Sequence, residues 1–246
     1  MGMINRIRIL RRLVDFQMAM YVRSYRNFLP MAVYLIAIVW IYSVVPNPIM
    51  SSYSATAVLL YLTAAWLGIS FYFTEPHMQQ NMTYLHTRPR LLYGISRILT
   101  AWLTCVPLAV FAMIYPLLRG AFIERATILH VFTAVYAHLL LALLGVLLAA
   151  LVCRLTGSRL IVTLGWLLIM LALSLSTGPL GESLPGVIRF IVWLLPPASL
   201  VMTAMMQFGE PHSSLLAGLI YPLIYTCALL LATLWLSERR GEVDWR

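Results

Sequence analysis

The chain has 246 residues, of which 62% are hydrophobic and only 10% are charged. Soluble domains have about 45–50% apolar and about 25% charged residues, so this composition excludes an ordinary water-soluble fold and indicates a membrane protein. All 17 basic residues are arginine, and with eight acidic residues the formal net charge is +9. Because the sequence has no lysine, it cannot form a Walker-type phosphate-binding loop or a Schiff base. In a membrane protein, an excess of arginine indicates the orientation of the chain more often than nucleic-acid binding.

Residues 3–27 precede the first long apolar run and are predicted to form an amphipathic helix. At about 100° per residue, apolar side chains gather on one face and most of the arginines on another. The apolar face consists of Met3, Ile7, Leu10, Val14, Met18, Tyr21 and Tyr25, and the polar face of Arg8, Arg11, Arg12, Asp15, Arg23 and Arg26. Such a helix lies in the membrane interface with its arginines at anionic headgroups. A basic tail that only sets the topology is the alternative.

A membrane-spanning helix needs about 20 apolar residues. Six stretches are predicted to span the membrane, namely residues 28–45, 54–73, 98–118, 128–152, 160–176 and 215–236. A further apolar stretch, residues 187–208, contains Pro196 and Pro197, and a proline pair breaks a helix. We expect this stretch to form two short re-entrant helices, which are tolerated at membrane depth only when they pack inside protein.

The distribution of arginine predicts the orientation of the chain. With the N-terminus in the cytoplasm, six spans place fourteen arginines in inside segments and three, Arg119, Arg125 and Arg189, in outside segments. This excess follows the positive-inside rule, whereas a seventh span would export the arginines of the C-terminal tail. The expected fold is therefore an all-α polytopic membrane protein, a single transmembrane domain over residues 1–246 with six transmembrane helices and both termini in the cytoplasm.

The first inside loop, residues 74–90, is the most informative segment. Thr74 can cap a helix that has Pro76 in its first turn, and Arg88-Pro89 would end that helix. The apolar face of this helix would carry Met78, Met82 and Leu85. Because a bare connector needs only a few residues, the capped helix predicts a docking site for a soluble partner. A helix that lies flat on the bilayer is the alternative.

The sequence contains little that indicates chemistry. The predicted spans hold no Asp, Glu or Arg, which argues against an ion-coupled carrier and against a voltage sensor. His130 and His138 would lie about 12 Å apart along one helix, too far to share a metal, and are interpreted as polar packing residues. The three cysteines are interpreted as small buried residues, and no HExxH, GxSxG or CxxC motif occurs. We therefore expect no enzymatic activity, metal or cofactor in this chain.

Together, the amphipathic N-terminal helix, the six spans, the capped inside helix and the broken pair around Leu194-Leu195-Pro196-Pro197 resemble the membrane subunit of ABC-2-type exporters, the type V ABC transporter fold. The resemblance is architectural and covers essentially the whole chain. It implies a permease in a bacterial-type plasma (inner) membrane. Two membrane subunits, identical or paralogous, would form a dimer around a central path, and each would dock on a separate ATP-binding cassette subunit.

The resemblance also implies roles for particular residues. The helix that contacts the ATPase, called the coupling helix, corresponds to residues 75–85. Its expected docking residues are Glu75, His77, Met78, Gln79, Met82 and Leu85, and the expected outer gate is Leu195, Pro196 and Pro197. ATP and Mg²⁺ would be bound by the partner subunit, in agreement with the absence of lysine here. ATP-driven movement of the coupling helices would open the path outward for export.

Two other functions remain open at this point. A membrane scaffold or immunity protein that binds a toxin or partner without transporting it could use the same loop, and it would function with the ATPase inactivated. A carrier driven by ion gradients is opposed by the missing intramembrane carboxylates. The uncharged interior predicts amphipathic or hydrophobic cargo, such as peptides or lipid-linked molecules.

Overall fold

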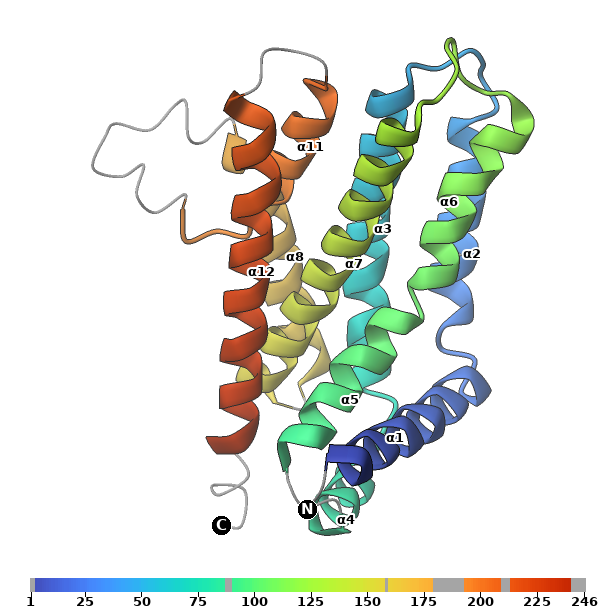
Figure 1. The fold of residues 1–246 in the computed structure, drawn as a ribbon. Coiled ribbons are helices and arrows are strands. Elements are labelled where there is room, and N and C mark those ends of the chain that lie inside the picture. Colours follow the sequence, from blue (N-terminus) through green and yellow to red (C-terminus); the bar gives the residue numbers. More distant parts are fainter. Residues whose placement is uncertain (1–2, 87–89, 158, 179–192, 209–212, 240–246) are drawn as a thin grey trace.

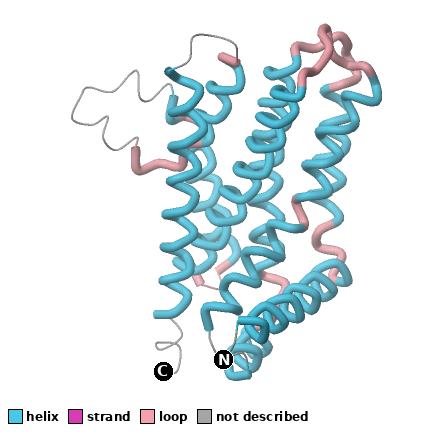
Figure 2. Tube along the Cα trace, viewed as in Figure 1, coloured by secondary structure: helices cyan, strands magenta, loops and turns pink. Residues whose placement is uncertain are grey.

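The computed structural model describes residues 3–86, 90–157, 159–178, 193–208 and 213–239, which form an all-helical bundle (Figure 1). In chain order the helices are α1 (Met3–Arg23), α2 (Phe28–Ile41), α3 (Ile49–Tyr72), α4 (His77–His86), α5 (Arg90–Leu103), α6 (Val106–Arg119), α7 (Ile128–Thr156), α8 (Leu160–Leu175), α11 (Ala198–Met206) and α12 (Ser213–Arg239). The long helices run alternately between the two ends of the bundle, and most described loops lie at these ends, as Figure 2 shows. Helices α1 and α4 lie together at one end, which we call the α4 end.

In the part of the chain that the structure describes, four helical stretches are long and apolar enough to cross a membrane. They are α3, residues Leu91–Arg119 of α5 and α6, α7, and residues Gly218–Ser237 of α12. Helices α1 and α2 make a fifth only if this pair, which is bent by 79°, counts as one span. Helix α8 is apolar but has only 16 residues, roughly 24 Å of helix against about 30 Å of hydrocarbon. By length and composition, the described residues therefore contain four or five candidate spans, fewer than the six predicted.

The ends of two helices differ from the predicted spans. Helix α3 begins at Ile49, five residues before the predicted span 54–73. Helix α2 ends at Ile41, although the apolar run continues to residue 45. Beyond the helix, Asn47 pairs with the loop that follows α6: its backbone N–H donates to the Ala121 carbonyl at 2.8 Å. Hydropathy alone does not register such a contact between distant loops.

Helix α5 extends beyond the predicted span 98–118, and the extension brings a charged residue into the apolar stretch. This helix begins at Arg90, eight residues before the predicted span, and the apolar stretch from Leu91 includes Arg97. Arg97 is only 5% exposed. An arginine can occupy such a place because its polar atoms find partners inside the protein. One of these is the Tyr72 carbonyl oxygen, which accepts a hydrogen bond from Arg97 Nη2 at 3.2 Å.

The predicted pair of re-entrant helices is described only in its second half. Helix α11 (Ala198–Met206) follows the proline pair directly and lies against α12 and α3 near the end of the bundle opposite α4 (Figure 1). Residues 187–192, on which the first helix of the pair was predicted, lie outside the described residues.

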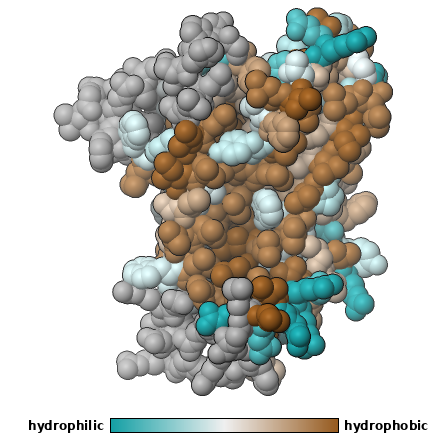
Figure 3. Space-filling model, in the orientation of Figure 1, coloured by the Kyte–Doolittle hydropathy of each residue, from teal (hydrophilic) through white to brown (hydrophobic). Residues whose placement is uncertain are grey.

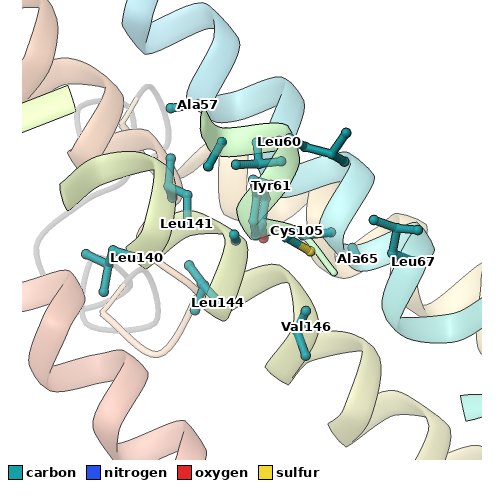
Figure 4. Packing of buried hydrophobic residues seen from close by; sticks show 14 of the residues in the cluster. Ala57, Leu60, Tyr61, Ala65, Leu67, Cys105, Leu140, Leu141, Leu144 and Val146 are labelled. Atoms are coloured by element: carbon teal, nitrogen blue, oxygen red, sulfur yellow. The ribbon is translucent and has the colours of Figure 1, made fainter. Parts of the chain in front are cut away.

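The core is built around the contact between α3 and α7, which Figure 4 shows from close by. A Cβ atom at Gly145 of α7 would lie only 2.5 Å from the Tyr61 carbonyl oxygen, and one at Gly68 of α3 only 2.7 Å from the Ala149 Cβ. Real Cβ atoms essentially never come this close to another heavy atom. Small residues thus bring the two helices together, as is common where helices pack in a membrane.

The outer surface of the bundle is also apolar. In the face shown in Figure 3, hydrophobic side chains cover the middle, and hydrophilic ones gather at the two ends on the side of α1 and α6. On α8, a single stripe of Thr163, Leu167, Leu171 and Ser174 is buried, whereas Ile161 and Leu168 are exposed. A surface of this kind is stable in contact with lipid tails and unstable in water, which supports a membrane location.

Replacement of Gly145 by alanine tests the close contact of α3 and α7. The new methyl group would overlap the α3 backbone, so we expect Gly145→Ala to lower the free energy of unfolding by about 1–3 kcal/mol. Gly165→Ala on α8 is the matched control, because a Cβ there meets no atom within 4 Å. Thermal unfolding of the purified proteins in detergent measures both effects. Equal unfolding temperatures for the two variants would contradict the contact.

Candidate docking site

Helix α4 lies at the α4 end, with α3 leading into it and α5 leading away (Figure 1). Its first turn is formed by a hydrogen bond from the Gln80 N–H to the Pro76 carbonyl at 3.0 Å. Thr74 does not cap this helix as predicted. Its hydroxyl instead donates to the Ser70 carbonyl at 2.7 Å, one turn back in α3. The helix therefore begins at His77, two residues later than predicted, and Arg88-Pro89 lies outside the described residues.

Glu75 is buried, although it was expected to be a docking residue. Its side chain is 4% exposed, and the Tyr93 hydroxyl of α5 donates a hydrogen bond to its Oε2. The Gln80 side-chain amide donates to the Glu75 carbonyl oxygen at 2.8 Å. Because the carboxylate is enclosed, it cannot be presented to a partner. Glu75 instead fastens the start of α4 to α5.

Arg97 makes a second connection between the same elements. Its Nη1 donates to the Gln80 Oε1 at 3.3 Å, in addition to the bond from Nη2 to the Tyr72 carbonyl. Its guanidinium carbon lies 4.2 Å from the centroid of the Tyr72 ring, a cation–π contact. One buried cation on α5 thus holds both the end of α3 and the first turn of α4.

Helix α1 is joined to α5 and α3 through buried polar side chains. The Gln17 Nε2 donates to the Ser96 Oγ at 3.0 Å, and its Oε1 accepts from the Thr100 hydroxyl at 3.0 Å. The Tyr21 hydroxyl donates to the Leu67 carbonyl at 3.2 Å. Burial raises the pKa of the Tyr21 phenol to about 12, so it remains a hydrogen-bond donor at neutral pH.

The buried face of α1 differs from the predicted apolar face. Tyr21 is buried as expected, but Ile7 is 60% and Tyr25 80% exposed. Gln17, which is 0% exposed, lies on the buried face and was missed because it is polar. Its spacing in the sequence could have indicated this burial. Gln17 is four residues from both Leu13 and Tyr21, which puts all three on one face of the helix.

The side of α4 that faces away from these anchors carries methionine. Met78 and Met82, one turn apart, are 74% and 62% exposed. Gln79 is half-buried, and its Nε2 lies 3.8 Å from the Met20 Sδ of α1. A groove of about 470 Å³, which we call the α1–α4 groove, is lined by Phe16, Ala19, Met20, Arg23, Ser24, Thr74, Pro76 and Gln79. The groove and the two methionines together form an open surface of mixed apolar and basic character.

The other predicted site residues are placed as follows. His77 and Leu85 belong to α4, but their side chains lie outside the described part of the structure. Of the expected outer gate, Leu195 is half-buried, and Pro196 and Pro197 are buried directly before α11. Helix α11, which these three residues precede, lies near the end of the bundle opposite α4 (Figure 1). The structure therefore does not bring the gate residues to the docking residues.

The two histidines of α7 occupy different environments. His138 is 0% exposed; its Nε2 lies 3.1 Å from the Thr56 hydroxyl and its Nδ1 2.7 Å from the Ala134 carbonyl oxygen. His130 belongs to the helix start, where its Nδ1 accepts a hydrogen bond from the Thr127 N–H at 3.1 Å. Both imidazoles are thus engaged in hydrogen bonds that stabilise α7 or its packing. Among the described residues, no group of three or more His, Cys, Asp or Glu side chains could hold a metal ion.

Comparison of the chain with protein-family models, curated proteins and solved structures finds no match. The geometry of the α4 end is therefore the basis for a functional proposal.

Removal of the Tyr93 hydroxyl tests the anchoring of α4. Tyr93→Phe leaves the buried Glu75 carboxylate without this donor, so we expect a loss of about 1–3 kcal/mol in the free energy of unfolding. We also expect faster hydrogen exchange of the backbone amides in residues 77–86. Tyr25→Phe removes a hydroxyl from an 80% exposed side chain and should change stability by less than about 0.5 kcal/mol. Unchanged exchange in the Tyr93 variant would mean that the bond does not hold α4.

Proposed function

We propose that this chain is the membrane-spanning permease subunit of an ATP-driven exporter and that it docks a separate ATPase through α4 and the α1–α4 groove. The observation that carries the proposal is that Met78 and Met82 are exposed on a short helix that buried side chains hold firmly to the bundle. A helix that only connects two spans needs neither these anchors nor an exposed apolar side.

The position of α4 favours a soluble partner over the bilayer as the surface that covers the methionines. In Figure 1, α4 lies farther from the middle of the bundle than α1 does, and the middle is the apolar part of the surface shown in Figure 3. A helix at this distance is better placed to contact a protein than lipid tails. Exposed Arg23 at the groove and nearby Arg26 predict that the partner has an apolar pocket with carboxylates at its rim.

The anchors give the docking helix a mechanical connection to the membrane helices. Glu75 and Tyr93 join α4 to α5, and Arg97 joins α5 to the end of α3. A displacement of α4 by its partner would therefore move α3 and α5 together. In the proposed cycle, ATP binding and hydrolysis by the partner, which would hold the nucleotide and Mg²⁺, produce that displacement and open an outward path between two membrane subunits.

The proposal retains six crossings, with α2 and α8 as two short ones and with the α4 end in the cytoplasm. Helices of 14 and 16 residues can cross where the bilayer thins locally or where flanking side chains reach the interface. Both termini would then be cytoplasmic, as the distribution of arginine predicts. The side from which a reagent labels cysteines introduced next to α4 checks this orientation.

A charge placed on α4 tests the docking. We expect Met78→Glu to weaken the complex with the ATPase at least tenfold, because a carboxylate would replace the apolar contact with the partner. Ile123→Glu is the control, since Ile123 is a 63% exposed apolar residue in the loop after α6, at the opposite end. The measurement is co-purification of the chain with a partner that is identified by its phosphate-binding lysine motif, followed by ATP-dependent efflux in reconstituted vesicles. If both variants bind the ATPase as the parent does, α4 is not the docking helix.

The same system separates a transporter from a membrane scaffold. A permease requires ATP hydrolysis, so replacement of the phosphate-binding lysine of the partner should abolish efflux while the complex remains intact. If the chain keeps its full biological effect with this inactive partner, the scaffold or immunity function replaces the exporter.

A further inference from the structure

Arg154 lies in the last turn of α7, and some of its side-chain hydrogen-bond donors are unpaired. Its Nε and Nη2 atoms are closed to solvent and have no hydrogen-bond partner. The residue as a whole is half-buried, so part of its side chain lies at the protein surface. A guanidinium group withdrawn from water without a counter-ion is costly. No acidic side chain among the described residues pairs with it, so the arrangement calls for a further anion.

Neighbouring groups increase the need for an anion. The Cys153 sulfur lies within electrostatic range of the Arg97 and Arg154 guanidinium groups, so two cations share this region. Arg159 is exposed at the start of α8, and no acidic residue occurs between residues 154 and 159. The partial negative charge at the C-terminus of α7 amounts to about half an elementary charge, too little to balance Arg154 and Arg159.

The apolar surface beside Arg154 indicates what kind of anion fits. Leu155, Leu160 and Ile161 are 56%, 46% and 86% exposed. They belong to the C-terminal end of α7 and to the start of α8. A soluble phosphate would leave these side chains uncovered, whereas the acyl chains of a lipid would cover them. We propose that Arg154, with Arg159 close by in the chain, binds the phosphate of an anionic phospholipid at the α7–α8 turn.

Lipid competition on the intact, purified chain tests this site. Detergent-solubilised protein is equilibrated with equal amounts of phosphatidylglycerol and phosphatidylcholine, and bound lipids are counted by native mass spectrometry. We expect a preference for phosphatidylglycerol that falls about fivefold in Arg154→Gln. Arg125→Gln, which removes the same charge from an exposed residue at the opposite end, should keep the preference. Arg154→Lys should keep most of it, because the charge remains.

Two results would overturn the proposal. One is an unchanged lipid preference in Arg154→Gln. The other is displacement of phosphatidylglycerol by glycerol 3-phosphate at similar concentration, which would identify a site for a soluble phosphate. If Arg154→Gln does not fold, the rise in unfolding temperature on addition of phosphatidylglycerol is measured in the parent and in Arg154→Lys. No rise in the parent beyond that with phosphatidylcholine would also refute the site.

Discussion

The arrangement of this protein depends on the close contact between α3 and α7. Inside a bilayer, apolar side chains gain little by leaving lipid for protein, so helices associate through close packing and hydrogen bonds. Gly68 and Gly145 allow the two backbones to approach, because a side chain at either position would overlap the opposite helix. Once α3 is placed against α7, the position of its last turn is set as well. The carbonyl group of Tyr72 in that turn is the one that Arg97 binds, and α4 follows directly.

At the α4 end, hydrogen bonds between buried polar side chains fix the relative positions of helices that apolar contacts alone would hold less tightly. A hydrophobic contact tolerates small shifts, but Gln17 is satisfied only when Ser96 and Thr100 stand in one relative position, and Glu75 requires the Tyr93 hydroxyl in the same way. Such groups are costly to bury unless they are paired, and they therefore favour a single arrangement. The methionines on the outside of α4 have the opposite property, because their flexible side chains adapt to a partner surface. A firmly held helix with an adaptable exposed side suits the docking role proposed for α4.

The candidate site was predictable in part. The segment between two apolar runs, with Met78 and Met82 at a spacing of four, indicated a helix with an apolar side, and the structure has that helix with both residues exposed. The roles of Glu75 and Gln17 were not predictable in this way. A carboxylate beside a proline and a glutamine among arginines resemble surface residues until the partners that bury them are known. Those partners, Tyr93 and Ser96, lie 18 and 79 residues away in the chain.

By itself, the sequence determined that this is a helical membrane protein, because an apolar content of 62% cannot be enclosed in a soluble domain of this size. It also located most of the long helices, since apolar runs of sufficient length are a local property of the chain. Only the tertiary structure decided which polar residues are interior. Arg97 and Gln17 are buried because particular hydroxyl, amide and carbonyl groups on other helices surround them. Whether a polar side chain is stable inside a protein depends on such partners in space, and no local average along the sequence contains them.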